Sequence, residues 1–227
     1  MFQIEVTDRW HTTFPGSHIG VLLIGNVDNS RRITPLDQRK REIETRLRQQ
    51  FAGFSRADLM KLEVLQAYRS YYKKFGKTYH VQLQLESVVQ QGKPLPSVSP
   101  LVDANFAAEL ETLILTAGHD ADLLESPVTI DATQGGELFR QINGLVQSLK
   151  SNDMMMSDSK GIVCTILYGQ DVRTSISPNT CRALYVAYAP SGVLKTMVQQ
   201  QLDSIHENIL LVAPEAEIEM VEVFAAK

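Results

Sequence analysis

Apolar runs separated by polar segments predict that the chain mixes buried strands with amphipathic helices. Most positions of segments 18–27 and 183–189 are apolar, which is typical of strands that are covered on both faces. The polar stretch 148–159 is expected to be an exposed loop, and 169–179 a long connection between two strands. Shorter apolar runs predict further strands at residues 2–6, 127–132, 162–168 and 218–224.

Apolar residues at helical spacing predict five helices. Thr34 followed by Pro35 marks the start of the first, because a capping hydroxyl precedes a proline that fits the first turn. Its buried stripe consists of Ile43, Leu47 and Phe51, which lie four residues apart. The other predicted helices cover residues 55–75, 82–91, 99–117 and 193–205, and Gly76, Gly92 and Gly118 follow the first three of these.

The helix predicted at residues 99–117 has an apolar and a polar face. We expect the apolar face to be buried and the polar face to point away from the core. The apolar face carries Val102, Phe106, Leu110 and Leu113, and the polar face carries Asn105, Glu109 and Thr112.

The order of these elements indicates the fold class. Helices and strands are mixed without a regular strand–helix–strand alternation, and no internal repeat is visible. We therefore predict an α+β fold with mixed or antiparallel sheets and flanking helices, in one domain that covers residues 1–227.

The composition is that of an ordinary globular protein, with 44% hydrophobic and 21% charged residues. The net charge is −4, but residues 1–80 contain fourteen Lys and Arg against eight Asp and Glu. This local excess permits nucleic-acid contact by the first third of the chain, whereas the overall charge excludes a globally basic binder.

Several features indicate a cytoplasmic protein without membrane attachment. The N-terminal residues 1–8 lack the basic flank of a signal peptide, and the apolar run 19–24 is too short to cross a bilayer. Cys164 and Cys181 have no ligand-like spacing, so we expect two reduced thiols, no metal site and no cofactor.

A basic and tyrosine-rich segment ends the second predicted helix and is the best RNA-binding candidate. Lysine and arginine neutralise phosphates, and a tyrosine ring can stack on an unpaired base. Alternatively, the cations complement the helix dipole and the tyrosines pack in the core. The candidate residues are Arg69, Tyr72, Lys73, Lys74 and Lys77.

Two further segments contain candidate site residues. His119 is followed by Asp120 and is expected in a loop. It could act as a general base or position a water, or it could simply be a solvated histidine. The connection 169–179 is either a ligand-binding loop or a wide turn whose side chains bond their own backbone. Its polar candidates are Gln170, Arg173, Thr174 and Asn179. Neither a nucleotide-binding glycine loop nor a nucleophile elbow is present, which disfavours covalent hydrolase chemistry.

Parts of residues 93–180 resemble the tRNA-binding and editing domain of the bacterial phenylalanyl-tRNA synthetase beta subunit, and especially free-standing proteins built from that domain. The resemblance implies the fold of that domain, with a core at about residues 68–190, N-terminal strands and basic helices before it, and a C-terminal helix and strand at 191–227. The passages that carry it include Lys93-Pro94-Leu95-Pro96, Asp103-Ala104-Asn105-Phe106, Gly118-His119-Asp120, Met156-Ser157-Asp158-Ser159-Lys160-Gly161, Tyr168-Gly169-Gln170-Asp171 and Asn179-Thr180.

The resemblance also implies site residues. It implies His119 and Asn105 as catalytic residues, although the family's histidine falls on Ala117 and its Thr-Asn pair on Asn105-Phe106. Val186 falls where the synthetase uses a glutamate to bind the tyrosine hydroxyl, which disfavours tyrosine-specific editing. Substrate contacts are implied for Asp103, Phe106, Asp120, Gly169, Gln170, Arg173, Thr174, Asn179 and Val186.

Two functions remain open at this point. The first is a tRNA-binding module that hydrolyses a mischarged aminoacyl-tRNA in trans, with tRNA as partner and no DNA binding. The second is a non-catalytic binding protein that keeps the fold, with a small amino-acid-like ligand or none. A functional synthetase is excluded, because neither a catalytic core nor an ATP motif is present.

Overall fold

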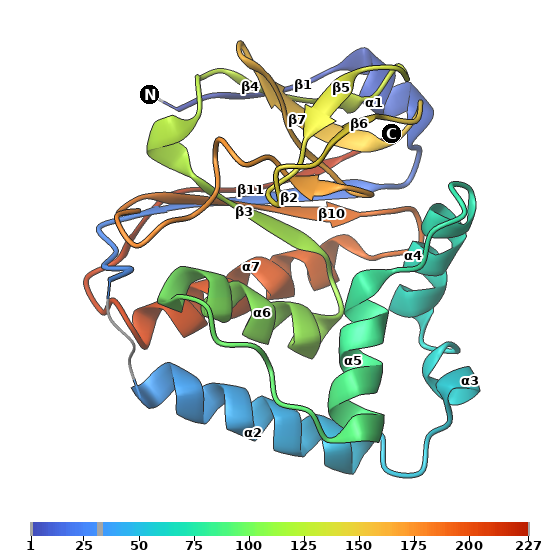
Figure 1. Cartoon of the computed structure of the whole chain (residues 1–227), viewed down its shortest axis with the longest axis vertical. Coiled ribbons are helices and arrows are strands. Elements are labelled where there is room, and N and C mark those ends of the chain that lie inside the picture. The colour runs from blue at the N-terminus through green and yellow to red at the C-terminus, as the bar shows by residue number, and fades with distance from the viewer. Residues whose placement is uncertain (1, 31–33, 227) are drawn as a thin grey trace.

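The computed structural model of the chain describes residues 2–30 and 34–226, and it shows two β-sheets stacked on layers of helices (Figure 1). The strands are Ile4–Val6 (β1), His18–Gly25 (β2), Thr116–Asp120 (β3), Val128–Ala132 (β4), Leu138–Arg140 (β5), Val146–Ser148 (β6), Met154–Asp158 (β7), Gly161–Thr165 (β8), Gly169–Gln170 (β9), Ala183–Ala189 (β10) and Glu217–Ala225 (β11). The helices are Asp8–Thr13 (α1), Thr34–Gln50 (α2), Arg56–Leu59 (α3), Glu63–Lys73 (α4), His80–Gln91 (α5), Pro100–Thr112 (α6) and Lys195–Leu210 (α7), with a 3-10 turn at Ala121–Leu123 (η1).

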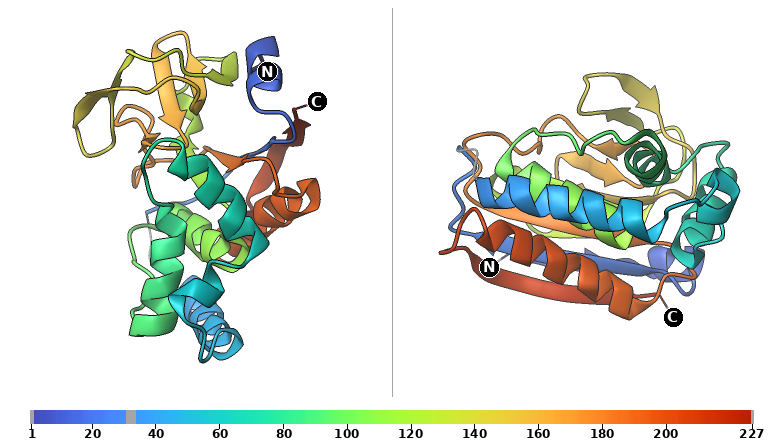
Figure 2. Two further views of the ribbon diagram at one scale, coloured as in Figure 1. Left: turned by 90° about the vertical axis from the view of Figure 1, so that its right-hand side faces the viewer. Right: turned by 90° about the horizontal axis from the view of Figure 1, so that it is seen from below.

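The strands form two main sheets and one hairpin. Sheet A has the order β1-β4-β7-β8-β9, with β1 and β4 parallel. Sheet B has the order β11-β2-β10-β3 and is antiparallel. β5 and β6 form a separate hairpin that projects beyond the sheets (Figure 2). The predicted α+β class with mixed and antiparallel sheets is confirmed.

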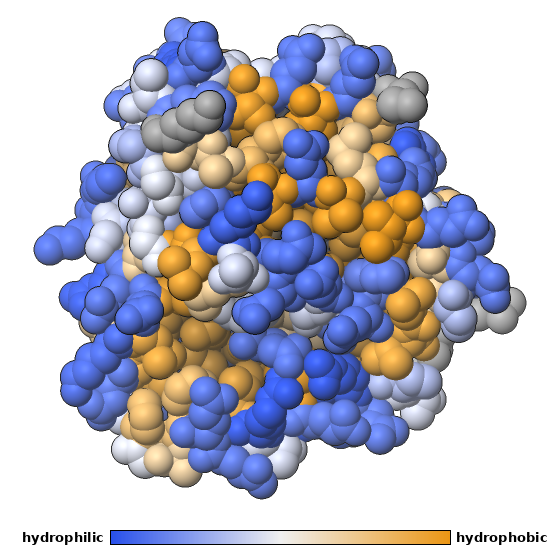
Figure 3. Space-filling view, turned by 180° about the vertical axis from the view of Figure 1, so that it is seen from behind, coloured by the Kyte–Doolittle hydropathy of each residue, from blue (hydrophilic) through white to orange (hydrophobic). Residues whose placement is uncertain are grey.

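Sheet B is the centre of the molecule because both of its faces are covered. Sheet A lies over one face, while α6 and α7 pack on the other and α2 packs on α6 (Figure 1). All seven residues of β10 are buried, as expected for an apolar strand between two layers. The side of the molecule that faces away from the viewer in Figure 1 contains α7 and β11. It shows separate apolar patches among hydrophilic residues (Figure 3).

Three sequence predictions about the elements were wrong. The helix predicted at 55–75 is two helices, α3 and α4, separated by Met60–Leu62. The helix predicted to end at Gly118 ends at Thr112, where Leu113 adopts a φ of +64°, and β3 follows. The segment 148–159 is not an exposed loop, because it contains β7, whose Met154 and Met156 are buried.

Helix α6 is buried on more sides than its sequence predicts. Asn105 and Glu109, expected on an outward face, are 6% and 3% exposed, whereas Val102 and Phe106 are only partly buried. The reason is that α6 packs against sheet B, α7, α2 and α5, so no side of the helix is fully exposed to solvent.

Lys40 of α2 and Asp103 of α6 form a buried ion pair that joins the two helix layers. Their Nζ and Oδ2 atoms lie 2.7 Å apart, and the side chains are 4% and 9% exposed. Lys40 also donates to the Pro96 carbonyl at 2.6 Å and the Ser97 hydroxyl at 2.9 Å, and Asp103 Oδ1 accepts from the Val98 N–H at 2.7 Å. The pair therefore fixes the 93–99 segment as well as the two helices.

We predict that Lys40→Met lowers the free energy of unfolding by about 3–5 kcal/mol, because it leaves the Asp103 carboxylate buried without its counter-charge. In a urea denaturation series, Lys40→Met/Asp103→Leu should lose about 1–3 kcal/mol less than the sum of the two single variants. Lys61→Met, which removes an exposed pair with Asp58, is the control and should change stability little. Additive losses would show that the pair does not act as a unit.

Candidate binding cavity

A cavity of about 440 Å³ lies at the free edge of sheet B, where β3 is the last strand. Helix α6 forms one wall, β3 the second, and β8 with β9 the third. The lining is mostly apolar and aromatic with a few polar groups, which is the usual character of a small-molecule site. The lining residues are His80, Val98, Val102, Asn105, Phe106, Glu109, Leu115, Thr116, Ala117, Gly118, Ile142, Cys164, Thr165, Tyr168, Gly169, Gln170, Ile176, Tyr185 and Tyr188.

Two buried side chains of α6 hold the first residue of β3 in place. Asn105 Nδ2 donates to the Thr116 carbonyl at 2.9 Å, and Glu109 Oε1 accepts from the Thr116 N–H at 2.6 Å. The two side chains thus bond the main-chain N–H and C=O of Thr116, which a neighbouring strand would otherwise bond. Within the part of the chain that the structure describes, Asn105 Oδ1 is buried and has no hydrogen-bond partner.

The Glu109 carboxyl is the most perturbed acid on the cavity wall. Burial raises its pKa to about 8, and only the bond from the Thr116 N–H opposes this shift. The carboxyl is therefore mostly protonated at neutral pH. It would ionise if a positive charge entered the cavity.

The Cys164 thiol and the Tyr188 hydroxyl on the wall are not activated as nucleophiles. Burial raises the pKa of the Cys164 thiol far above its usual range, which makes it a poor nucleophile. Tyr188 is also buried, and its pKa is raised in the same way. The cavity thus offers binding surface and polar anchors rather than a nucleophile.

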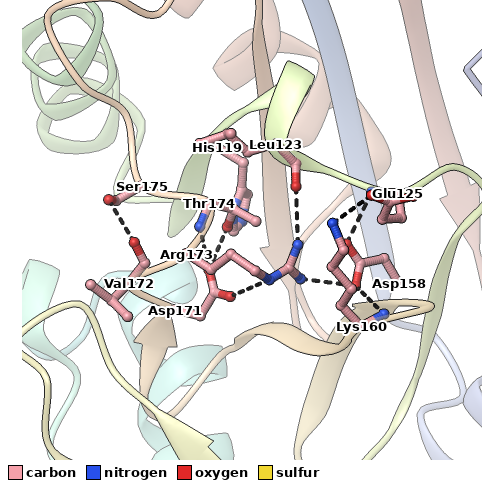
Figure 4. Close-up of polar contacts among 10 residues, drawn as sticks. All are labelled: His119, Leu123, Glu125, Asp158, Lys160, Asp171, Val172, Arg173, Thr174 and Ser175. Atoms are coloured by element: carbon pink, nitrogen blue, oxygen red, sulfur yellow. Dashed lines mark hydrogen bonds and ion pairs between the residues drawn. The ribbon is translucent and has the colours of Figure 1, made fainter.

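His119 lies in β3 rather than in a loop, and it does not line the cavity. Its Nδ1 is 2.7 Å from the Thr174 hydroxyl, which itself donates to the Asp171 carboxylate (Figure 4). This arrangement places the imidazole proton on Nδ1. Burial and then the charge of Arg173 lower the pKa of His119 to about 3, so the ring is neutral at pH 7. The side chain is fully buried outside the cavity wall, so it does not reach a ligand there.

Arg173 continues the same network on the far side of Asp171. Its guanidinium lies 3.5 Å from Asp171 Oδ2 and 2.8 Å from Asp158 Oδ1, and it donates to the Leu123 carbonyl at 3.0 Å (Figure 4). Asp171 Oδ1 also accepts from the Thr174 N–H at 2.9 Å. The polar residues of this segment therefore stabilise the loop itself, as the wide-turn alternative predicted.

The structure divides the predicted site residues into two groups. Asn105, Phe106, Gly169 and Gln170 line one cavity, as expected for segments that come together around a ligand. The rest, which do not line it, are Asp103, His119, Asp120, Arg173, Thr174, Asn179 and Val186.

Asp120 and Asn179 have places outside the cavity. Asp120 Oδ2 accepts from the Thr180 hydroxyl at 2.6 Å, and Oδ1 accepts from the Asp122 N–H at 3.1 Å. Asn179 is exposed, and its N–H donates to the Ser177 hydroxyl at 3.2 Å. These contacts support the turn around η1 and the connection before β10.

Val186 is fully buried in β10 and does not line the cavity. Its neighbour Tyr185 bonds the Leu101 carbonyl of α6. Because successive side chains of a strand point to opposite faces, Val186 points towards sheet A, as does Tyr188, which lines the cavity. The disfavoured specificity for tyrosine therefore stays a prediction.

The basic segment lines a second depression of about 570 Å³ beside the cavity. Arg69, Lys73 and Lys77 line it together with Arg56. Lys77 connects the two sites, because its Nζ lies 3.6 Å from the ring centroid of Tyr168, a residue of the cavity wall. We call this depression the basic groove.

Two members of the predicted RNA-binding set lie elsewhere. Lys74 is exposed but lines a different depression, with Tyr71 and Asn152. Tyr72 is 2% exposed and donates to the Ile166 carbonyl at 2.6 Å, so it cannot stack on a base. The tyrosines of α4 pack in the core, which was the alternative interpretation.

Sequence reasoning missed most of the cavity wall. Glu109 was assigned to an outward face, and Thr116 and Gly118 were assigned to a helix and its end. Tyr185 and Tyr188 looked like ordinary core residues of a buried strand. The only available indication was the i, i+4 spacing of Asn105 and Glu109, two polar residues in a helix otherwise rich in apolar residues.

Comparisons with known proteins give a family. The profile of the B3/4 domain matches residues 66–208, and this match confirms the predicted resemblance to the phenylalanyl-tRNA synthetase beta subunit. An N-terminal fragment of that subunit from Pyrococcus horikoshii is similar to the chain, with 7% identity and a TM-score of 0.46. The similarity covers 98% of this chain and 50% of the fragment, so the chain spans about half of its length. No curated protein matches the chain.

A helix that crosses a membrane needs about 20 mostly apolar residues. Among the described residues, none of the helices is both long enough and apolar enough to cross a bilayer.

We predict that Glu109 makes the protein less stable as the pH rises. A carboxyl with a folded pKa of about 8 stabilises the fold below its unfolded pKa, and this contribution is lost as the pH rises through 8. Glu109→Gln keeps an acceptor for the Thr116 N–H and cannot ionise. Between pH 4.5 and pH 8.5, its stability relative to wild type should rise by roughly 4 kcal/mol.

Chemical denaturation at several pH values measures this difference. Asp153, whose pKa burial raises to about 7, titrates in both proteins and should largely cancel. Glu63→Gln, an exposed substitution on α4, is the control and should show no such trend. A pH-independent difference between Glu109→Gln and wild type would contradict the prediction.

Proposed function

The chain belongs to the B3/4 domain family, a synthetase-related module of the editing type, and we propose that it binds the aminoacyl end of a transfer RNA and hydrolyses the ester there. The observation that carries this proposal is the position of the mostly apolar cavity directly beside the basic groove. An aminoacyl-tRNA end consists of an amino-acid group joined to a phosphate-linked chain, so it needs both kinds of surface next to each other.

A contact between residues of the two sites supports this arrangement. Lys77 lines the basic groove and lies over Tyr168 of the cavity wall. A ligand with its side chain among Val102 and Phe106 could therefore place its phosphates along Lys77 and Lys73. The groove's cations point to RNA only together with the cavity, because cations at a helix end are common without a ligand.

The chemistry of the wall limits the mechanism of hydrolysis. The Cys164 thiol has a raised pKa, and His119 does not line the cavity. Attack by a bound water is therefore the reaction that fits this wall. Gln170 is a polar side chain on the β8–β9 wall that can orient such a water, whereas the Thr165 hydroxyl is already bonded by the Tyr168 N–H.

A second function is binding without catalysis. It is favoured by the position of His119, the proposed general base, whose ring is buried in the Thr174–Asp171 network. In this case the cavity would hold an amino-acid-like group and release it unchanged.

We predict that filling the cavity abolishes the activity. Wild type is tested against a panel of aminoacyl-tRNAs with apolar amino acids, and at least one ester should be hydrolysed faster than the uncatalysed rate. Val102→Trp places an indole in the cavity and should reduce this rate at least tenfold. Val221→Trp, at an exposed valine of β11, is the size-matched control and should leave the rate unchanged.

The same panel separates the two functions. Binding of the esters without turnover would support the non-catalytic function. If Val102→Trp hydrolyses and binds every ester as well as wild type, the cavity is not the site.

We also predict that the basic groove sets the salt dependence of tRNA binding. Each lost phosphate contact to a single strand should reduce the slope of log K against log salt by about 0.7. Arg69→Ala/Lys73→Ala should therefore flatten the slope by about 1.4, whereas Lys74→Ala, outside the groove, should leave it unchanged. Equal effects of the groove variant and Lys74→Ala, measured by filter binding, would place the phosphates elsewhere.

A further inference from the structure

One wall of the cavity presents hydrogen-bond acceptors that the protein does not fully use. Asn105 is 6% exposed, and its Nδ2 is committed to the Thr116 carbonyl, which fixes the orientation of the amide. Its Oδ1 is then an acceptor, and within the described residues it has no donor. A buried polar atom without a partner is rare, because leaving it unpaired is unfavourable.

Glu109 stands beside Asn105 on the same wall. The two residues are one helical turn apart at i and i+4, which makes their side chains neighbours on α6. Glu109 Oε1 accepts from the Thr116 N–H, and the second oxygen of the carboxyl becomes a further acceptor at the same wall when the carboxyl ionises. Thr116 therefore orients both side chains.

We infer that Asn105 and Glu109 form a binding site for the primary ammonium group of the ligand. An ammonium group has three N–H donors and no acceptor, which matches a pair of acceptors on one helix face. The surrounding wall of Val102, Phe106 and Leu115 suits an apolar body attached to that group. For the proposed function, on which this inference rests, the group is the α-ammonium of the aminoacyl ester.

The acceptors of the wall favour a cation over other ligands. A carboxylate ligand has no donor for Asn105 Oδ1, and its charge would keep Glu109 protonated. A hydroxyl could bond Asn105 Oδ1, but it brings no charge that would ionise Glu109, so its binding would release no proton. An ammonium group can pair with both and also neutralise the carboxylate that it creates.

Binding of an ammonium group at this place releases a proton. Glu109 is mostly protonated in the free protein at neutral pH, because burial raises its pKa to about 8. The entering positive charge favours the carboxylate, so that the carboxyl proton leaves to the solvent. The other titratable groups on the wall are His80 from α5, Cys164 from β8, Tyr168 before β9, and Tyr185 and Tyr188 from β10.

The test uses leucine methyl ester and phenylalanine methyl ester as probes, each with its N-acetyl derivative. Binding to the full chain is measured by isothermal titration calorimetry at pH 6.0, where the free esters are ammonium ions, in two buffers of different ionisation enthalpy. The free amines should bind at least tenfold more tightly than the acetylated esters, which cannot form an ammonium group. Their binding should release close to one proton.

Variants assign the proton and the contacts. Glu109→Gln keeps the bond to Thr116 and should abolish proton release and weaken binding at least tenfold. Asn105→Ala should weaken binding of the amine but keep proton release. Asp203→Asn, an exposed acid-to-amide change on α7, is the matched control and should change neither.

The outcomes distinguish this site from the proposed function. Equal affinity for amines and acetylated esters would overturn the ammonium site and leave the aminoacyl-binding function intact. Proton release that persists in Glu109→Gln would also overturn it, because a group other than Glu109 would be the source. Binding of neither kind of ester by wild type, together with no aminoacyl-tRNA binding, would overturn both.

Discussion

The structure depends on the burial of α6, a helix that has almost no solvent face. Sheet B, α7, α2 and α5 surround it, so each polar side chain on it must find a partner inside the protein. Asp103 is paired with Lys40, and Asn105 and Glu109 bond the main chain of Thr116. These contacts connect the helix layers to the sheet, and they also determine which polar atoms are left for a ligand.

The edge of sheet B explains why the cavity lies where it does. β3 is an edge strand, and an edge strand has main-chain groups without a neighbouring strand. Asn105 and Glu109 cover its first residue, and the 174–175 segment covers its end through the Asp120–Thr174 and His119–Ser175 contacts. Between these two supports, Thr116 to Gly118 border the open space. The cavity is thus formed by the same features that protect the edge.

Two polar clusters of the molecule have different roles because only one of them borders the cavity. In the network of His119, Thr174, Asp171 and Arg173, each residue has at least one close partner, and the network holds the loop before β10. In the pair of Asn105 and Glu109, one buried acceptor is unused and one carboxyl is held neutral by burial. The first cluster holds one loop together, whereas the second borders an open cavity and is suited to binding.

The sequence by itself determined the elements whose pattern is local. Segment 183–189 was predicted as a buried strand and is β10. The sequence Thr34-Pro35 predicted a helix start, and α2 begins at Thr34. Cavity residues Asn105, Phe106, Gly169 and Gln170 followed from the family resemblance. Only the tertiary structure decided which faces are buried. Glu109 and His119 were misplaced because their positions depend on which layers pack above and below them, and contacts between layers leave no periodic pattern in the chain.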